Sequence, residues 1–163
     1  TSFVMRMIQQ GKLRFPVPLG YKVTLHDPCH LGRFNKGYDA PRDILKAIGC
    51  DLVDMKRSRD NSFCCGAGGG RIWIPDPVGL EKPSALRMRE AAEIEGLEVF
   101  VVCCPKDLTM FEDALKTSGY EGQFIVRELI ELITEASERA AATDENGGRP
   151  GTAVNADADP ALA

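Results

Sequence analysis

Several features that mark common functional classes are missing from this sequence. No stretch approaches the roughly 20 apolar residues that span a bilayer, so we expect no membrane span in this chain. The N-terminus lacks the charged, apolar and small-residue succession of a secretory signal. Lys and Arg number 20 against 24 Asp and Glu, with no basic run interleaved with aromatics. We therefore expect a cytoplasmic protein with no nucleic-acid partner.

The 163 residues are 44% hydrophobic, which suits one globular domain with its own core. Residues 1–20 are predicted to form an opening helix and a linker that lead from an upstream region. Residues 21–141 are predicted to form the globular domain. Residues 142–163 are small, polar and acidic, without a periodic apolar set, and are predicted to be a disordered tail.

Strand and helix patterns alternate along the chain. Strands are predicted at 22–27, 51–55, 98–104 and 123–126, and helices at 40–49, 82–96, 105–115 and 127–141. This alternation predicts an α/β fold with a small, mostly parallel sheet flanked by helices. The loops at the carboxyl ends of such strands converge on one crevice, where we expect the functional site.

Six cysteines are present, and cytosolic disulfides are rare, so metal binding or redox chemistry is the leading explanation. Cys50 follows a glycine at the end of a predicted helix and is expected to be a small buried hydrophobe. The other five lie where an apolar element gives way to a turn or helix, in three places: HDPCH with Cys29, FCCGAGGGR with Cys64 and Cys65, and VVCCPKD with Cys103 and Cys104.

The residues around these thiols suit an inorganic cofactor. Helix N-termini lower thiol pKa values, and the Cys-Cys-Gly and Cys-Pro steps are predicted to lie at helix starts. Gly66, Gly68 and Gly69 are expected to let the backbone approach the cofactor. A nucleotide loop is disfavoured, since Arg71 stands where GxGxxG needs its last glycine and no Gly-Lys-Ser/Thr follows. Adjacent cysteines fit a tetrahedral zinc site poorly, so we favour an iron–sulfur cluster and keep zinc as the alternative.

HDPCHLGRFNKGYDAPRDILKAIG followed by SFCCGAGGGRIW resembles the cysteine-rich CCG domain of heterodisulfide reductase subunits and related iron–sulfur oxidoreductases. The resemblance runs from about Val23 to Leu115 and is greatest to the branch that exchanges electrons with flavoproteins. The family pattern is a single Cys, then Cys-Cys-Gly, then Cys-x-x-Cys. It implies four thiolate ligands, and it places an aspartate where the last cysteine should stand: Cys29, Cys64, Cys65, Cys104 and then Asp107.

The resemblance implies a [4Fe–4S] cluster, which is non-cubane where five cysteines of such a motif hold it. Three ligand sets fit this sequence. Asp107 ligates through a carboxylate oxygen, which we rank first; or Cys103 substitutes; or four thiolates hold a cubane with Asp107 nearby. Cys103 ranks lower because neighbouring side chains in extended chain point to different sides. The remaining interpretation of Asp107 is an early-helix acid favoured by the helix dipole.

The function that the resemblance implies is electron transfer between a flavoprotein dehydrogenase or electron-transfer flavoprotein and another carrier. The domain would belong to an oxidoreductase complex, with an upstream iron–sulfur domain in the same chain or complex. One alternative is a catalytic heterodisulfide reductase site, although that chemistry uses two such motifs and this chain has one. Another alternative is a zinc-stabilised interaction module.

Several neighbouring residues have two interpretations. His26, His30 and Arg33 would bond or balance the cluster, or HDP would be a strand-ending turn in which Asp27 caps the next segment. Charge balance or simple exposure would explain Arg71 and Lys106. Trp73 would shield the cluster from water or contact a partner, or it would pack in the core, which we favour. The start of the helix at 40–49 is expected to be solvated, with the charged residues Asp39, Arg42 and Asp43.

Overall fold

A computed structural model describes residues 1–75 and 78–146, in which four strands form one parallel sheet. The strands are β1 (Lys22–Leu25), β2 (Asp51–Leu52), β3 (Val99–Val102) and β4 (Ile125–Glu128). Their order is β2-β1-β3-β4, and every pairing is parallel. The sequence prediction of an α/β fold with a small parallel sheet is confirmed.

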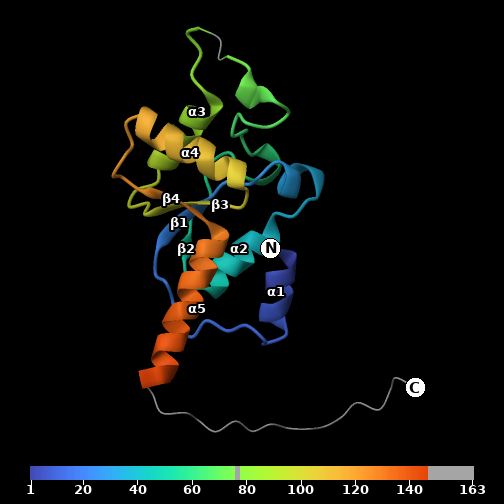
Figure 1. The fold of residues 1–163 in the computed structure, drawn as a ribbon, viewed down its shortest axis with the longest axis vertical. Helices are drawn as coiled ribbons and strands as arrows, with labels where there is room; N and C mark the ends of the chain where they lie inside the picture. The colour runs from blue at the N-terminus through green and yellow to red at the C-terminus, as the bar shows by residue number, and fades with distance from the viewer. Residues whose placement is uncertain (76–77, 147–163) are drawn as a thin grey trace, which may run out of the picture.

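Helices cover both faces of this sheet (Figure 1). On one face lie α1 (Ser2–Gln9), α2 (Asp39–Ala47) and α5 (Leu129–Asn146), and on the other lie α3 (Pro83–Ala92) and α4 (Pro105–Thr117). Short helical turns occupy the connections: a π-helical turn, η1 (His30–Phe34), and two 3-10 turns, η2 (Arg59–Asn61) and η3 (Arg71–Trp73). The domain therefore has three layers, with its connecting turns concentrated at one end of the sheet.

The alternation of side chains along the central strands builds two hydrophobic cores. On β3, Val99 and Val101 pack with α2 and α5, while Phe100 and Val102 pack with α3 and α4. All four are at most 1% exposed, as expected for a parallel strand buried on both faces. Cys50 belongs to the first core, which confirms its prediction as a buried hydrophobe.

The C-terminal helix extends further than the sequence predicts. We expected a tail from residue 142, but α5 continues to Asn146. The rest of the predicted tail, 147–163, lies outside the described residues. Within the described part of the chain, every helix is too short or too polar to cross a bilayer.

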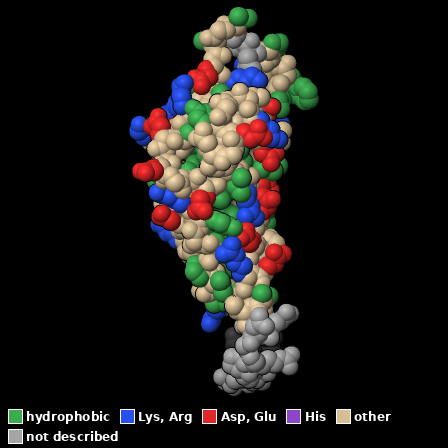
Figure 2. All heavy atoms as spheres, turned by 90° about the vertical axis from the view of Figure 1, so that its left-hand side faces the viewer, with side chains coloured by type: hydrophobic (Ala, Val, Ile, Leu, Met, Phe, Trp, Pro, Cys, Tyr) green, Lys and Arg blue, Asp and Glu red, His purple; other side chains and the backbone are tan. Residues whose placement is uncertain are grey.

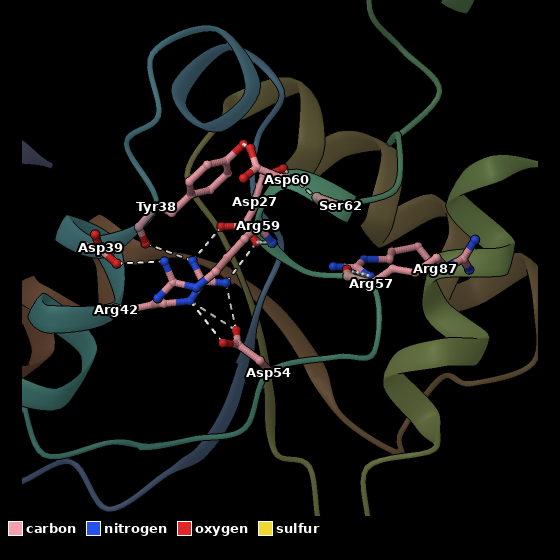
Figure 3. A network of polar contacts seen from close by, with 10 residues as sticks. All are labelled: Asp27, Tyr38, Asp39, Arg42, Asp54, Arg57, Arg59, Asp60, Ser62 and Arg87. Atoms are coloured by element: carbon pink, nitrogen blue, oxygen red, sulfur yellow. Dashed lines mark hydrogen bonds and ion pairs between the residues drawn. The ribbon is translucent and has the colours of Figure 1, made fainter.

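A buried ion pair joins α2 to the end of β1 (Figure 3). Arg42 is 2% exposed, and its Nη1 and Nη2 donate to the two carboxylate oxygens of Asp27 at 2.6 and 2.8 Å. Its Nε and Nη2 also donate to Asp54, just after β2. The prediction that Arg42 is solvated was therefore wrong, because this bidentate pairing stabilises its charge inside the protein.

Asp27 also holds the loop that precedes the Cys-Cys-Gly step. The backbone N–H of Arg59 donates to its Oδ2 at 2.7 Å, and the Ser62 hydroxyl donates to its carbonyl oxygen at 3.2 Å. Burial acts to raise the pKa of Asp27, but the hydrogen bonds from Arg42 and Arg59 hold it below its ordinary value. The carboxylate thus stays charged and fastens three segments together, which is not the capping role considered from the sequence.

Replacing Arg42 tests this fastening. Arg42→Met leaves the Asp27 carboxylate buried without its main partner, and we expect the free energy of unfolding to fall by about 3–5 kcal/mol. Asp43→Asn, at an exposed neighbour on α2, is the control and should change it by less than about 0.5 kcal/mol. Urea unfolding of the metal-free protein measures both. A loss below about 1 kcal/mol for Arg42→Met would contradict the assigned role of the pair.

Candidate metal centre

The cysteine loops follow the two central strands of the sheet. Cys29 lies in the loop that follows β1, after His26, Asp27 and Pro28, and β3 is followed directly by Cys103 and Cys104. From β1 the chain goes on to β2 on one side, and from β3 it goes on to β4 on the other. The gap between β1 and β3 is therefore the switch point of the sheet, where ligands of α/β proteins bind.

A cavity of about 300 Å³ opens at this point. Four cysteines and one aspartate line it together with neighbouring loop residues: Cys29, Cys65, Cys103, Cys104 and Asp107. Cys64 lines a smaller adjoining cavity of about 40 Å³, which Cys29 also borders. The fold therefore gathers all five thiols that the sequence singled out, with Cys29 between the two cavities.

Cys29 is exposed and immediately precedes the π-helical turn η1. Arg33 in this turn donates from Nη2 to the carbonyl oxygen of Ser62 at 2.9 Å. This bond ties the Cys29 segment to the chain two residues before Cys64. Arg33 is thus placed to fix the spacing of two cysteine loops.

The Cys-Cys-Gly step lies in an irregular loop, so its prediction as a helix start was wrong. Glycine conformations shape the loop instead: φ is +88° at Gly66 and +61° at Gly69. The Gly66 N–H donates to Cys64 Sγ at 3.3 Å, and the Ala67 N–H donates to the sulfur of Cys65. The backbone N–H groups that we expected from a helix end are thus supplied by a tight turn.

The Cys-Pro step does begin a helix. Cys104 is the N-cap of α4 and Pro105 is its first residue. Asp107 follows in the first turn, 3% exposed, with its side chain on the wall of the cavity. Cys103 lines the same cavity, although it also packs against the first hydrophobic core.

Two ionisable groups in the cavity wall have raised pKa values. Burial raises the pKa of Cys65 to about 12, and its thiol lies within hydrogen-bonding reach of Asp107. Burial also raises the pKa of Asp107, whose Oδ2 has no hydrogen-bond partner among the described residues. A buried carboxylate oxygen without a partner is costly. Metal ions satisfy such oxygens and convert neighbouring thiols to thiolates, so this donor set fits a metal group.

The remaining predicted residues divide between the cavity and the surface. Gly68, His30 and Lys106 line the cavity. Arg71 lies outside its lining and donates from Nη1 to the carbonyl oxygen of Ile74. Trp73 is 85% exposed, so the prediction that it packs in the core was wrong.

The exposed tryptophan belongs to a protruding segment. Ile74 and Leu80 in this segment are 58% and 68% exposed. Figure 2 shows hydrophobic side chains at this end of the molecule. The glycine-rich turn therefore leads away from the core into a projection that carries apolar surface.

The thiols line a cavity and do not converge on the position of a single metal ion. Zinc ligands must all lie about 2.0–2.3 Å from one centre. Within residues 1–75 and 78–146, no three His, Cys, Asp or Glu side chains are grouped closely enough to hold a single metal ion. The donors instead line the 300 Å³ cavity from three different loops.

Fold and site together define a small α/β domain with a thiol- and carboxylate-lined cavity at the switch point of its sheet. The chain belongs to the CCG family of cysteine-rich domains, whose sequence model matches residues 23–112.

Three curated relatives illustrate the family. The chain is 39% identical over 137 residues to a probable iron-sulfur-binding oxidoreductase, FadF, of Bacillus subtilis. It is 35% identical over 143 residues to an EtfAB:quinone oxidoreductase of Syntrophomonas wolfei. It is 36% identical over 140 residues to one component of the dihydromethanophenazine:CoB–CoM heterodisulfide reductase of Methanosarcina barkeri.

These relatives are much longer than the chain. The three matches cover 83%, 85% and 83% of this chain but only 19%, 20% and 32% of the respective relatives. No solved structure matches the chain significantly.

The glycine turn gives a direct test of the loop geometry. Gly66→Ala forces a side chain onto a positive φ, and we expect the free energy of unfolding to fall by about 1–2 kcal/mol. Gly68→Ala is the matched control, because its φ is ordinary and the described residues leave open space at its Cβ position. Its effect should stay within about 0.5 kcal/mol in urea unfolding of the metal-free protein. Equal losses for the two variants would contradict the turn's dependence on Gly66.

Proposed function

We propose that this domain holds an iron–sulfur cluster and relays electrons between a flavoprotein and another carrier. The observation that carries the proposal is the cavity of about 300 Å³ in which Cys29, Cys65, Cys103, Cys104 and Asp107 converge. A cavity walled by thiols from three loops suits a multi-iron group better than a single zinc ion, whose ligands must meet at one point. The relative named as a probable iron-sulfur-binding oxidoreductase supports the same cofactor.

The proposed ligands are Cys29, Cys64, Cys65 and Cys104, with Asp107 as a fifth ligand through a carboxylate oxygen. Three of these thiols line the main cavity with Asp107, and Cys64 lines the adjoining one beside Cys29. Cys103 is the alternative ligand, because it also lines the main cavity. We propose a [4Fe–4S] cluster, with the non-cubane form as the case in which all five ligands bind. When bound, such a cluster supplies one-electron redox chemistry.

The surrounding residues have separate tasks in this proposal. The N–H groups of Gly66 and Ala67 donate to the sulfurs of Cys64 and Cys65 and stabilise them as thiolates. Gly68 leaves the cavity wall open to close backbone approach. Lys106, at the cavity lip, offsets part of the negative charge of the thiolates.

The proposed redox partner is an electron-transfer flavoprotein or a flavoprotein dehydrogenase. The relative named EtfAB:quinone oxidoreductase supports this choice. Because the relatives are several times longer than this chain, an additional iron–sulfur domain in the same polypeptide or complex is part of the proposal. Catalytic disulfide reduction is the alternative function that the relative named as a heterodisulfide reductase raises.

Metal analysis of anaerobically purified protein tests the cofactor. We expect about four iron and four sulfide per chain and a visible charge-transfer absorption that bleaches on reduction. Cys104→Ser should lose most of this iron. Cys50→Ala should retain it, because Cys50 lies in the first hydrophobic core. One zinc and no iron in the unaltered protein would contradict the proposal.

Substitution of Asp107 tests the fifth ligand. Asp107→Cys should retain the iron but shift the EPR spectrum and the reduction potential, since a thiolate replaces a carboxylate at the metal. Asp107→Ala should bind less iron or release it faster. Cys103→Ala is the control for the alternative ligand and should leave the spectrum unchanged. Identical spectra and potentials for both Asp107 variants and the unaltered protein would show that Asp107 is not a ligand.

A further inference from the structure

The wall of the cavity continues inward from Asp107 to a buried histidine. His26 directly follows β1 and is 1% exposed. Its ring packs edge-on against Phe111 at 4.7 Å between centroids and stacks on Phe100 at 6.2 Å. Its Nε2 lies 3.8 Å from Oδ2 of Asp107. Two aromatic side chains therefore hold the imidazole in one orientation, with Nε2 towards the carboxylate.

The imidazole of His26 and the carboxyl group of Asp107 each have a buried polar atom without a hydrogen-bond partner. Among the described residues, Asp107 Oδ2 and His26 Nδ1 are buried and have no hydrogen-bond partner. The separation of 3.8 Å exceeds a hydrogen bond by less than 1 Å, because N–H···O bonds span about 2.7–3.2 Å. The two atoms must therefore approach from 3.8 Å to about 3.2 Å or less for the bond to form.

The surroundings favour a neutral imidazole that carries one proton. Burial and the positive charge of Arg87 on α3 together lower the pKa of His26 to about 3. Arg87 is itself fully buried, and its Nη1 is held by Glu90 and by the carbonyl oxygen of Arg57. A neutral imidazole has one donor and one acceptor nitrogen, and a carboxylate selects the tautomer that donates to it.

We propose that His26 is a positioning residue that donates its Nε2–H to Oδ2 of Asp107 and so leaves Oδ1 to face the cluster. The inference rests on the proposed function and assigns the site a residue that is not itself a ligand. Carboxylates that bind metals are commonly held by such hydrogen bonds, and losing one weakens metal binding by about 10- to 100-fold. The imidazole would thereby fix both the rotamer and the binding oxygen of Asp107.

The test measures how fast the reconstituted protein loses its visible absorbance to excess EDTA under anaerobic conditions. His26→Leu removes the donor, and we expect loss at least about 10-fold faster than in the unaltered protein. His26→Gln keeps an amide N–H near the position of Nε2 and loses the same aromatic packing. It should therefore release iron within about threefold of the unaltered rate. Lys116→Gln, at an exposed position in the last turn of α4 and outside the cavity lining, is the positional control and should leave the rate unchanged.

A double substitution separates positioning from packing. In the Asp107→Cys background no carboxylate remains to be oriented, so adding His26→Leu should change the rate by less than about twofold. Equal acceleration in both backgrounds, or loss of all iron in both, would overturn the inference and assign His26 a packing role. An unchanged rate for His26→Leu alone would also overturn it while leaving the cluster intact. Unaltered protein without iron would overturn the proposed function together with this inference.

Discussion

The cysteine site depends on one buried ion pair, between Arg42 and Asp27. Asp27 lies two residues before Cys29. Its carboxylate accepts hydrogen bonds from the Arg42 guanidinium of α2 and from the Arg59 N–H in the loop before Cys64. Asp54, just after β2, accepts hydrogen bonds from Nε and Nη2 of the same guanidinium (Figure 3). Arg42 thus links the segments that follow two neighbouring strands, and Asp27 also holds the loop that precedes the Cys-Cys-Gly step. Without this ion pair, the loops that present Cys29 and Cys64 have fewer shared contacts.

The ion pair and the cavity wall differ in whether their buried polar groups have hydrogen-bond partners. The Asp27–Arg42 pair is satisfied by the protein alone, with every charged edge hydrogen-bonded. The cavity wall is not: Asp107 has an unpaired buried oxygen, and Cys65 has its pKa raised by burial to about 12. A domain with such a wall is incomplete by itself, because buried polar groups without partners are destabilising. We infer that binding a metal group and stabilising this end of the domain are coupled.

Much of the architecture follows from local patterns in the sequence. The alternation of strand and helix segments predicted the parallel sheet, and the rule that strand ends converge predicted the meeting of Cys29 with Cys103 and Cys104. The same rule brought Asp107 to the cavity, since α4 begins directly after β3. These features depend on periodicity and chain direction, which a single sequence contains.

The features that were not predicted depend on partners far away in the sequence. Arg42 is buried only because Asp27 and Asp54 receive it, although its position three residues before the core residue Leu45 was a usable signal. The Cys-Cys-Gly step forms a turn and not a helix start because Gly66 and Gly69 take positive φ values. Glycine can adopt positive or negative φ, so its presence in the sequence does not predict which one occurs. Trp73 is exposed because the projection that carries it leaves the core.

The central claim is that the converging thiols hold a redox-active cluster, and a potentiometric titration followed by EPR tests it most directly. The account predicts a reversible one-electron transition in the anaerobic protein, with a paramagnetic signal that disappears in Cys29→Ser and persists in Cys50→Ala. A protein that contains iron but shows no reversible transition in either redox direction would contradict electron transfer as its function. A signal that survives Cys29→Ser unchanged would contradict the assigned site.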